Sequence, residues 1–285
     1  MPLDPDKLLA LRIPDIEQSY SEKDVILYAL GIGLGRDPLD TRELSYVYEK
    51  KLRVLPTFPV VLGFEPYLLR DIDAGVTFAM AVHGEEQLTL HRPLPPSGTV
   101  VARRRFLDAI DKGADTGALL VMERALFDKT SGDALATMRE TVFCRADGGF
   151  GGAARPSPPA HPIPDRAPDF VCDLPTRPDM ALLYRLCADI NPLHADPEAA
   201  RAAGFPRPIL QGLGTFGVAG HAILRSVCGY DPARIKSVAG RFSAPVFPGE
   251  TIRTEIWRDG DLVSFRATVA ERDAVAINNG RAEVV

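Results

Sequence analysis

Residues 184–214 read YRLCADINPLHADPEAARAAGFPRPILQGLG, and the centre of this stretch is Asp189-Ile190-Asn191-Pro192-Leu193-His194. A carboxylate and an imidazole lie five residues apart, with a proline between them. Because proline removes a backbone N–H and fixes its own φ, Asp189 and His194 cannot share one uninterrupted helix. We therefore expect a bend that brings both side chains into one small volume, as general acid–base chemistry on a single water molecule requires.

A glycine-rich helix is predicted shortly after this bend. From Gly212 to Val227 the larger or close-packing residues follow the i, i+3, i+4, i+7 spacing over four turns. The glycines within it indicate tight packing, because a backbone approaches closely where a Cβ is missing. The first N–H groups of a helix have no partner inside it, so the N–H of Gly212 is a candidate donor to a developing oxyanion.

The strand pattern indicates two copies of one structural unit. Strand candidates follow the helix at residues 237–246, 250–258, 261–271 and 274–284, and Asp259-Gly260 is a strong hairpin signal. The first half has a capping box at residues 21–24, a short helix at 25–34, extended segments within 45–63 and strands at 99–107, 117–128 and 133–145. Long helices wrapped by antiparallel strands define an α+β fold with two repeats.

A proline-rich stretch divides the two halves. Residues 148–152 read GGFGG, and the following 153–168 contain six prolines, which favours a semi-rigid connection over a packed element. The predicted organisation is a first repeat at residues 1–152, a linker at 153–168 and a second repeat at 169–285.

Composition excludes several classes of function. The 285 residues carry a net charge of −5 with no basic stripe, so no nucleic-acid partner is expected. No apolar run approaches a membrane span, and the N-terminus is acidic and interrupted by proline, so we expect a cytoplasmic protein without a membrane partner. The four cysteines form no C-x-x-C pair, and therefore neither a metal site nor a disulfide framework is predicted.

The residues alone also allow purely structural interpretations of these side chains. Asp189 could cap a helix, and His194 could be an ordinary buried histidine. Asp196 precedes a proline, which fits a helix cap, and His221 within the long helix is expected to be structural. A metal held by Asp189, His194 and Asp196 is disfavoured because no further ligand lies at suitable spacing.

The pattern YRLxxDxNPLHxDPxxAxxxGFxxPILxG closely resembles the signature of the hydratase 2 family, the (R)-specific 2-enoyl-CoA hydratases with a MaoC-like hotdog fold. Short matches in the first half, among them His83-Gly84-Glu85 and Asp111-Lys112-Gly113, are similar to the two-hotdog form of the family. The resemblance covers nearly the whole chain. It implies a double hotdog in which the second repeat is catalytic and the first, non-catalytic repeat makes room for the acyl chain.

The implied reaction is the reversible syn hydration of a trans-2-enoyl-CoA to a (3R)-3-hydroxyacyl-CoA by a hydro-lyase that needs no cofactor. Asp189 and His194 would activate one water molecule, and the Gly212 N–H would stabilise the enolate-like thioester oxygen. Asn191 would orient the pair or the thioester. A homodimer is a further implication of the resemblance.

The surrounding residues are less well defined by the resemblance. Arg185 would support the site through an ion pair with Glu85. Gln211 stands where the family usually has a histidine before the glycine, and Cys187-Ala188 stands where it usually has Ser-Gly. These departures leave open which hydrogen bonds support the pair.

Two other functions remain as alternatives. A hotdog acyl-CoA thioesterase would direct water at the thioester carbonyl, and a non-catalytic homologue would only bind acyl-CoA. The sequence specifies neither the length of the acyl chain nor the pathway that it belongs to.

Overall fold

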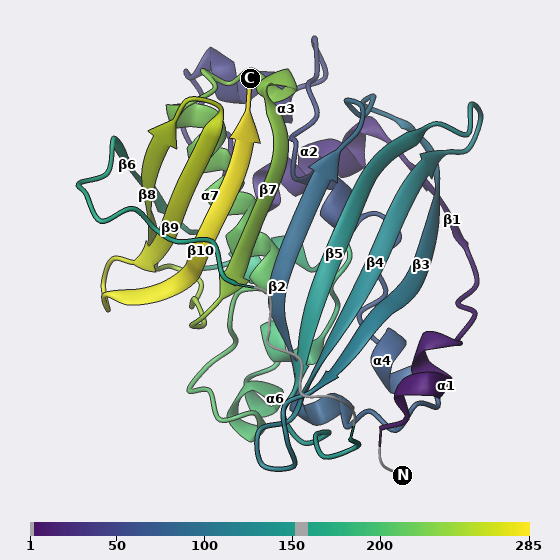
Figure 1. The fold of residues 1–285 in the computed structure, drawn as a ribbon. Coiled ribbons are helices and arrows are strands. Elements are labelled where there is room, and N and C mark those ends of the chain that lie inside the picture. The colour runs from purple at the N-terminus through teal and green to yellow at the C-terminus, as the bar shows by residue number, and fades with distance from the viewer. Residues whose placement is uncertain (1–2, 152–158) are drawn as a thin grey trace.

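The computed structural model describes residues 3–151 and 159–285, which form a ten-stranded antiparallel sheet in the order β1-β3-β4-β5-β2-β7-β10-β9-β8-β6 (Figure 1). Every neighbouring pair of strands is antiparallel. The strand bounds are β1 Ile16–Tyr20, β2 Ala81–Leu90, β3 Gly98–Asp111, β4 Ala118–Asp128, β5 Ala134–Cys144, β6 Phe170–Pro175, β7 Ile235–Phe242, β8 Thr251–Asp259, β9 Leu262–Val269 and β10 Ala274–Val284.

The strand order has an internal two-fold character. Reading outward from the centre, β2, β5, β4, β3 and β1 correspond to β7, β10, β9, β8 and β6. β2 and β7 pair with each other, from Glu85 opposite Arg241 to Thr89 opposite Ser237, and so join both halves into one sheet. The prediction of two copies of one α+β unit is therefore confirmed.

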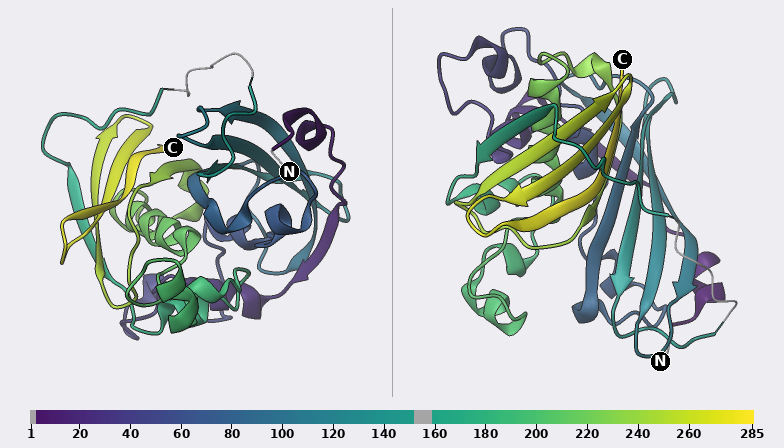
Figure 2. Two further views of the ribbon diagram at one scale, coloured as in Figure 1. Left: turned by 90° about the horizontal axis from the view of Figure 1, so that it is seen from below. Right: turned by 60° about the vertical axis from the view of Figure 1, so that its left-hand side comes forward.

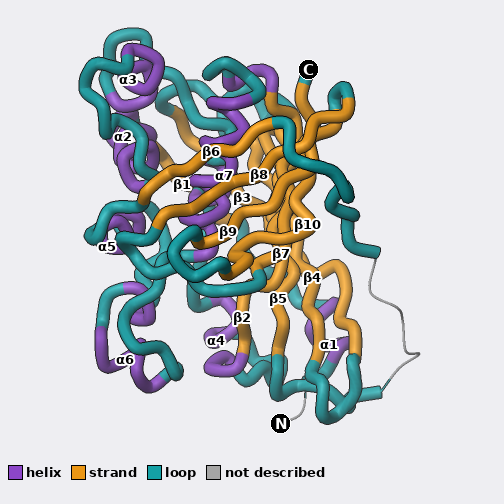
Figure 3. Tube along the Cα trace, turned by 90° about the vertical axis from the view of Figure 1, so that its left-hand side faces the viewer, coloured by secondary structure: helices purple, strands orange, loops and turns teal. Residues whose placement is uncertain are grey.

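Most helices lie on one face of this sheet, as Figure 3 shows, and the sheet curves around them (Figure 2, left). The helices are α1 Pro5–Leu9, α2 Glu22–Gly31, α3 Thr41–Val47, α4 Leu68–Asp71, α5 Met180–Tyr184, α6 Pro197–Ala202 and α7 Gly212–Ser226, with 3₁₀ turns η1 Phe58–Val61, η2 Phe78–Met80, η3 Pro192–His194 and η4 Pro232–Arg234. None of the helices in the described ranges is long and apolar enough to cross a membrane.

The glycine-rich helix α7 is the central helix of the second repeat, at the predicted position. Its residues from Leu213 to Leu224 are all buried, so it packs on every side. A Cβ at Gly217 would lie 2.7 Å from Ile32 Cγ2, and one at Gly220 would lie 2.6 Å from Thr57 Cγ2. The glycines therefore let segments of the first repeat pack directly on the α7 backbone, as predicted.

The prediction of a long helix in each repeat holds for the second repeat only. In the first repeat, residues 57–80 form the short elements η1, α4 and η2 instead. Pro59 and Pro66 interrupt any continuous helix, and Gly63 has a φ of +61°, outside the helical region. The prediction of extended segments within residues 45–63 is also wrong, because α3 and η1 occupy parts of this range and no strand forms there.

The described part of the predicted linker lies along the strands of the second repeat. The Trp257 indole N–H donates to the Arg166 carbonyl at 2.7 Å. The Asn279 side-chain amide donates to the His161 carbonyl at 2.8 Å, and the His161 ring bonds to Ser264 Oγ at 2.8 Å. Residues 153–158 lie outside the described residues, and the boundaries 1–152, 153–168 and 169–285 stay a prediction.

Replacing Gly217 by alanine should lower the free energy of unfolding by about 1–3 kcal/mol, because the added methyl group overpacks against Ile32 and the Tyr28 hydroxyl. Helix propensity alone favours alanine by about 1 kcal/mol, so a loss reports the close packing. Gly214→Ala is the matched control in the same helix, since its Cβ would find its nearest neighbour at 3.4 Å. Urea unfolding measures the stability of both variants, and equal stability would contradict the close packing at Gly217.

Candidate active site

The predicted bend brings Asp189 and His194 together. After α5 the chain turns at Asp189, whose Oδ1 accepts the Asn191 N–H at 3.1 Å, and Asn191 Oδ1 in turn accepts the Leu193 N–H at 3.0 Å. These two side chains shape the turn that leads into η3, which ends at His194. Asp189 Oδ2 lies 3.3 Å from His194 Nε2.

The hydrogen bonds of His194 define which ring nitrogen faces Asp189. Nδ1 lies 2.9 Å from the Ile209 carbonyl oxygen, which can only accept, so Nδ1 carries a proton. In the neutral ring Nε2 is therefore a hydrogen-bond acceptor, directed at the Asp189 carboxylate. A water molecule that donates one hydrogen to each group satisfies both, and a protonated ring pairs with the carboxylate directly. His194 is 7% exposed, so little bulk water competes for this position.

The start of α7 is attached to the same turn. Ile209, which accepts from His194, lies three residues before Gly212, the first residue of α7. Among the described residues no acceptor pairs with the Gly212 N–H, as expected for the first turn of a helix. A Cβ on Gly212 would lie 3.5 Å from the Phe242 ring at the end of β7.

Gln211 supports the site through backbone groups. Its side chain is fully buried, and its amide donates to the Ala181 carbonyl at 3.1 Å and lies 3.5 Å from the Asp189 carbonyl. Gln211 therefore connects α5, the turn that carries Asp189 and the start of α7. The Asn191 side-chain oxygen accepts the Leu193 N–H and so caps η3, which ends at His194; its expected role in orienting the pair or the thioester stays a prediction.

The expected ion pair between Arg185 and Glu85 is wrong. Glu85 Oε1 pairs with Arg241, at 2.6 Å from Nη2 and 2.8 Å from Nε. The reason is strand register: Glu85 and Arg241 stand directly opposite each other on β2 and β7. Arg185 Nε is buried without a hydrogen-bond partner among the described residues.

A buried charge cluster beside the site was not predicted from the sequence. Glu86 is 1% exposed and lies 3.1 Å from His83 Nε2, and Glu140 pairs with the buried Arg124 at 2.8 Å. Ligand atoms of His83, Glu86 and Glu140 lie within 4.8 Å of one another, an arrangement compatible with a metal ion. The Arg124 guanidinium already supplies a positive charge to Glu140, so the cluster is balanced by its own side chains.

An irregularity in β2 brings Glu86 to the same side as His83. Residues three apart in a regular strand point to opposite faces, but the register of β2 against β5 shifts between His83 and Glu85. This bulge at Gly84 resets the alternation and lets the His83 and Glu86 side chains meet. The signal in the sequence is the second of two successive glutamates, followed by the buried Leu88 at strand spacing.

Burial and neighbouring charge shift the protonation of this pair. Burial, together with the negative charge of Glu140, raises the pKa of Glu86 from 4.5 to about 7. Burial alone would lower the pKa of His83, but the hydrogen bond and charge of Glu86 outweigh it and raise that pKa. The His83 ring also contacts Phe242, with ring centroids 4.9 Å apart, and Phe242 adjoins Gly212. The cluster is therefore one aromatic ring away from the candidate oxyanion donor.

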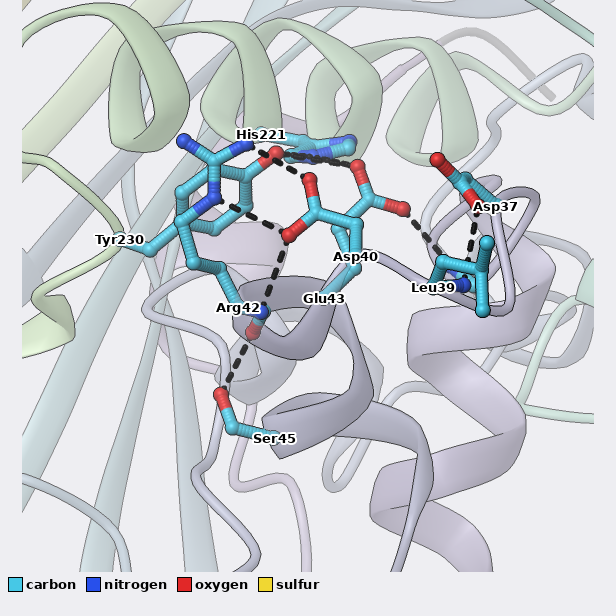
Figure 4. Close-up of polar contacts among 9 residues, drawn as sticks. Asp37, Leu39, Asp40, Arg42, Glu43, Ser45, His221 and Tyr230 are labelled. Carbon is cyan, nitrogen blue, oxygen red and sulfur yellow. Dashed lines mark hydrogen bonds and ion pairs between the residues drawn. The ribbon is translucent and has the colours of Figure 1, made fainter.

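A second cluster of buried polar side chains connects the two repeats in the C-terminal half of α7 (Figure 4). Glu43 of α3 accepts the Tyr230 hydroxyl at 3.0 Å, and His221 Nε2 of α7 lies 3.4 Å from the same oxygen. Burial would raise the pKa of Glu43, but the hydrogen bond and charge of His221 hold it below the usual value. Arg42 lies over the Tyr230 ring at 5.0 Å. His221 thus acts in the packing of α7 against the first repeat.

Comparisons with known proteins agree with this architecture. The model of the MaoC like domain matches residues 159–279, and that of the MFE-2 hydratase 2 N-terminal domain matches residues 18–146. A MaoC-like dehydratase from Phytophthora capsici superimposes with a TM-score of 0.87 at 36% identity, covering 98% of both chains. The full-length peroxisomal multifunctional enzyme type 2 from Drosophila melanogaster gives 0.83 at 35% identity, over 95% of this chain and 48% of that one.

These likenesses define the class of protein as a MaoC-like double hotdog and a hydro-lyase, which confirms the predicted fold class. Similar curated sequences include enoyl-CoA hydratase 2, peroxisomal, of Arabidopsis thaliana, 39% identical over 95% of this chain and 93% of that protein. The enoyl-CoA hydratase ChsH3 of Mycobacterium tuberculosis is 38% identical over 98% of each. The chain belongs to the enoyl-CoA hydratase 2 family.

The raised pKa of Glu86 predicts a pH-dependent stability. Between these two pKa values the folded state holds a proton on Glu86 that the unfolded chain has released. Glu86 therefore contributes fully to the free energy of unfolding below pH 4.5, and this contribution is lost as the pH rises to about 7. Glu86→Gln cannot titrate, and its free energy of unfolding should fall less than that of the parent between about pH 5 and pH 8, by on the order of 1–3 kcal/mol. Denaturant titrations at both pH values measure this.

The control for this experiment is Glu283→Gln, which removes a half-exposed glutamate on β10. It should reproduce the pH dependence of the parent. A parent and a Glu86→Gln variant with parallel pH profiles would show that the cluster holds no extra proton in the folded state.

Proposed function

We propose that this hydro-lyase catalyses the reversible syn addition of water to a trans-2-enoyl-CoA, giving a (3R)-3-hydroxyacyl-CoA. The observation that carries the proposal is the approach of Asp189 Oδ2 to 3.3 Å from His194 Nε2, beside the free N-terminus of α7. The names of similar proteins, enoyl-CoA hydratase 2 and 3-hydroxyacyl-thioester dehydratase Y, support the substrate class. Addition of water causes no net oxidation or reduction, so the proposed reaction needs no redox cofactor.

In the proposed mechanism, Asp189 and His194 hold one water molecule between them. The bond from Nδ1 to the Ile209 carbonyl leaves His194 Nε2 available as the base. The water oxygen adds to C3 of the enoyl group as one of its protons passes to the pair. A proton then returns to C2 from the same face, which gives syn addition and restores the pair.

Negative charge develops on the thioester oxygen during this addition. The Gly212 N–H at the first position of α7 is unpaired within the described residues and has the helix dipole behind it. In the proposed complex it donates to that oxygen, an interaction worth about 3–4 kcal/mol in other enzymes. Gln211 and Asn191 position this donor and the Asp–His pair, respectively.

The first repeat is proposed to accommodate the acyl chain without taking part in the chemistry. Its short elements η1 and α4 occupy the place that the 15-residue helix α7 fills in the second repeat, and so cover less of the sheet. A cytoplasmic location and a homodimer, both expected from the sequence, belong to this proposal as well. The name of the Arabidopsis thaliana relative places that protein in peroxisomes.

Asp189→Asn and His194→Gln should each lower kcat for the hydration of crotonyl-CoA by about 10²–10⁴-fold, because each removes a group that accepts a proton from water. Loss of absorbance of the enoyl thioester measures the rate. Circular dichroism and the urea midpoint should match the parent, since both changes keep the size of the side chain.

A variant of either kind that hydrates crotonyl-CoA at the parent rate would rule out the Asp–His pair. A thiol reagent in the same assay separates hydration from thioester hydrolysis. Stoichiometric release of free CoA by the parent would instead identify a thioesterase, and tight binding without turnover would identify a non-catalytic homologue.

Gly212→Pro tests the oxyanion donor, because it deletes the N–H while proline is tolerated at the first position of a helix. Gln211 already has a ψ of 138°, which a residue before proline prefers. We expect a loss in kcat of about 10²–10³-fold. Gly212→Ala keeps the N–H and makes only an ordinary contact with Phe242, so it should retain far more activity. Equal activity of both variants would exclude the donor.

A further inference from the structure

The two-fold arrangement of the sheet places a second position equivalent to the active site in the first repeat. In the second repeat, Leu210 to Gly212 enter the central helix next to Phe242 at the end of β7. The equivalent segment of the first repeat is Leu55 to Thr57, which enters η1, and the equivalent strand end is Leu90 of β2. A cavity lies at this place.

The cavity has an apolar floor and a volume of about 260 Å³. Leu55, Pro56, Leu94 and Ile235 line it and are buried. This volume is close to the lower limit of about 300–1,000 Å³ for ligand pockets, which restricts an occupant to a compact group. An aliphatic chain fits such a floor, because burying it removes apolar surface from water.

The rim of the cavity carries only positive charge. Arg53, Arg92 and Lys236 are exposed and line it, and none of the described residues that line it is acidic. Arg92 is neutralised by Asp133 at 2.6 Å. Arg53 and Lys236 donate to the backbone carbonyls of Tyr230 and Ala233 and form no ion pair with a carboxylate among the described residues. Their remaining donors are available to an anion.

We infer that this cavity, the counterpart of the active site in the non-catalytic repeat, binds an aliphatic carboxylate of medium chain length. The chain lies on the floor of Leu55, Leu94 and Ile235, and the carboxylate pairs with Arg53 and Lys236 at the rim. The lining includes one histidine, His91, whose Nε2 bonds to Thr137 Oγ1 at 2.8 Å, and none of the described lining residues is a carboxylate that could pair with it. The cavity therefore has no counterpart of the Asp189–His194 pair and binds without catalysis.

The cavity is separate from the catalytic site. His83, near the Gly212 end, and Leu90, at the cavity, are seven residues apart along β2. At a rise of about 3.3 Å per residue, the two ends of the strand are roughly 23 Å apart. Arg53 also bonds to the carbonyl of Tyr230, whose hydroxyl reaches Glu43 near His221 of α7 (Figure 4). The cavity therefore adjoins the polar group that packs α7 against the first repeat.

Calorimetric titration of the 285-residue chain with sodium octanoate tests this inference. The double variant Arg53→Gln/Lys236→Gln should bind about tenfold more weakly or worse, because charge-assisted hydrogen bonds to the carboxylate are lost. Arg103→Gln/Lys129→Gln is the matched control, since it removes the same charge from residues outside the cavity. Its affinity should equal that of the parent, and octylammonium should not bind the parent.

The Asp189→Asn variant tests whether octanoate binds independently of the catalytic site. Its affinity for octanoate should equal that of the parent. The rim variant should keep the parent rate with crotonyl-CoA, so this test is independent of the hydratase assignment. Unchanged octanoate binding in the rim variant, or its loss in Asp189→Asn, would overturn the inference. Rim-dependent binding of CoA but not of octanoate would also overturn it, since the occupant would then be a nucleotide phosphate.

Discussion

The pairing of β2 with β7 is the constraint on which the rest of the structure depends. It joins two five-stranded halves into one sheet and places Glu85 directly opposite Arg241. Because the two strands are antiparallel, the start of one lies beside the end of the other. His83 of β2 thus contacts Phe242 of β7, and Phe242 adjoins the first residue of α7. The proposed catalytic residues belong to the second repeat, but part of their surroundings comes from the first.

The absence of a long central helix in the first repeat has an electrostatic consequence. The turn η1 ends within a few residues and leaves the carbonyls of Val60 and Leu62 without helical partners. Arg124, which is 1% exposed, donates to both carbonyls and to Glu140. Burial of a guanidinium is costly unless such partners satisfy it. Arg124 therefore supplies the hydrogen bonds to these two carbonyls that further turns of helix would otherwise supply. Glu140 balances its charge.

The sequence predicted those features whose determinants are local. Pro192 and the cap formed by Asn191 fix the bend between Asp189 and His194 within six residues, and the glycine periodicity of α7 lies within four turns. Turn residues located most of the hairpin strands, whereas the short edge strands β1 and β6 lack comparable signals. The membership of the family was likewise readable from one continuous motif.

Features that depend on register between distant strands could not be predicted. The partner of Glu85 is 156 residues away, and only the alignment of β2 with β7 selects Arg241 over Arg185. The position of Glu86 depends on a bulge at Gly84 that reverses the alternation of β2. A pattern of charges in the sequence indicates which residues are able to pair, but the register decides which of them do.

Two repeats of one topology carry different side chains on a similar backbone. The entry to α7 is held by a backbone bond from the Leu210 N–H to the Val246 carbonyl, at 2.7 Å, which no side chain controls. Such a bond holds the backbone of a site, here called its frame, in place even where the side chains around it differ. In the second repeat the frame presents a carboxylate and an imidazole at 3.3 Å, and at the equivalent place in the first it presents prolines, aliphatic side chains and cations. In the proposed function, catalysis therefore depends on side chains that differ between the two repeats, whereas the strand topology is common to both.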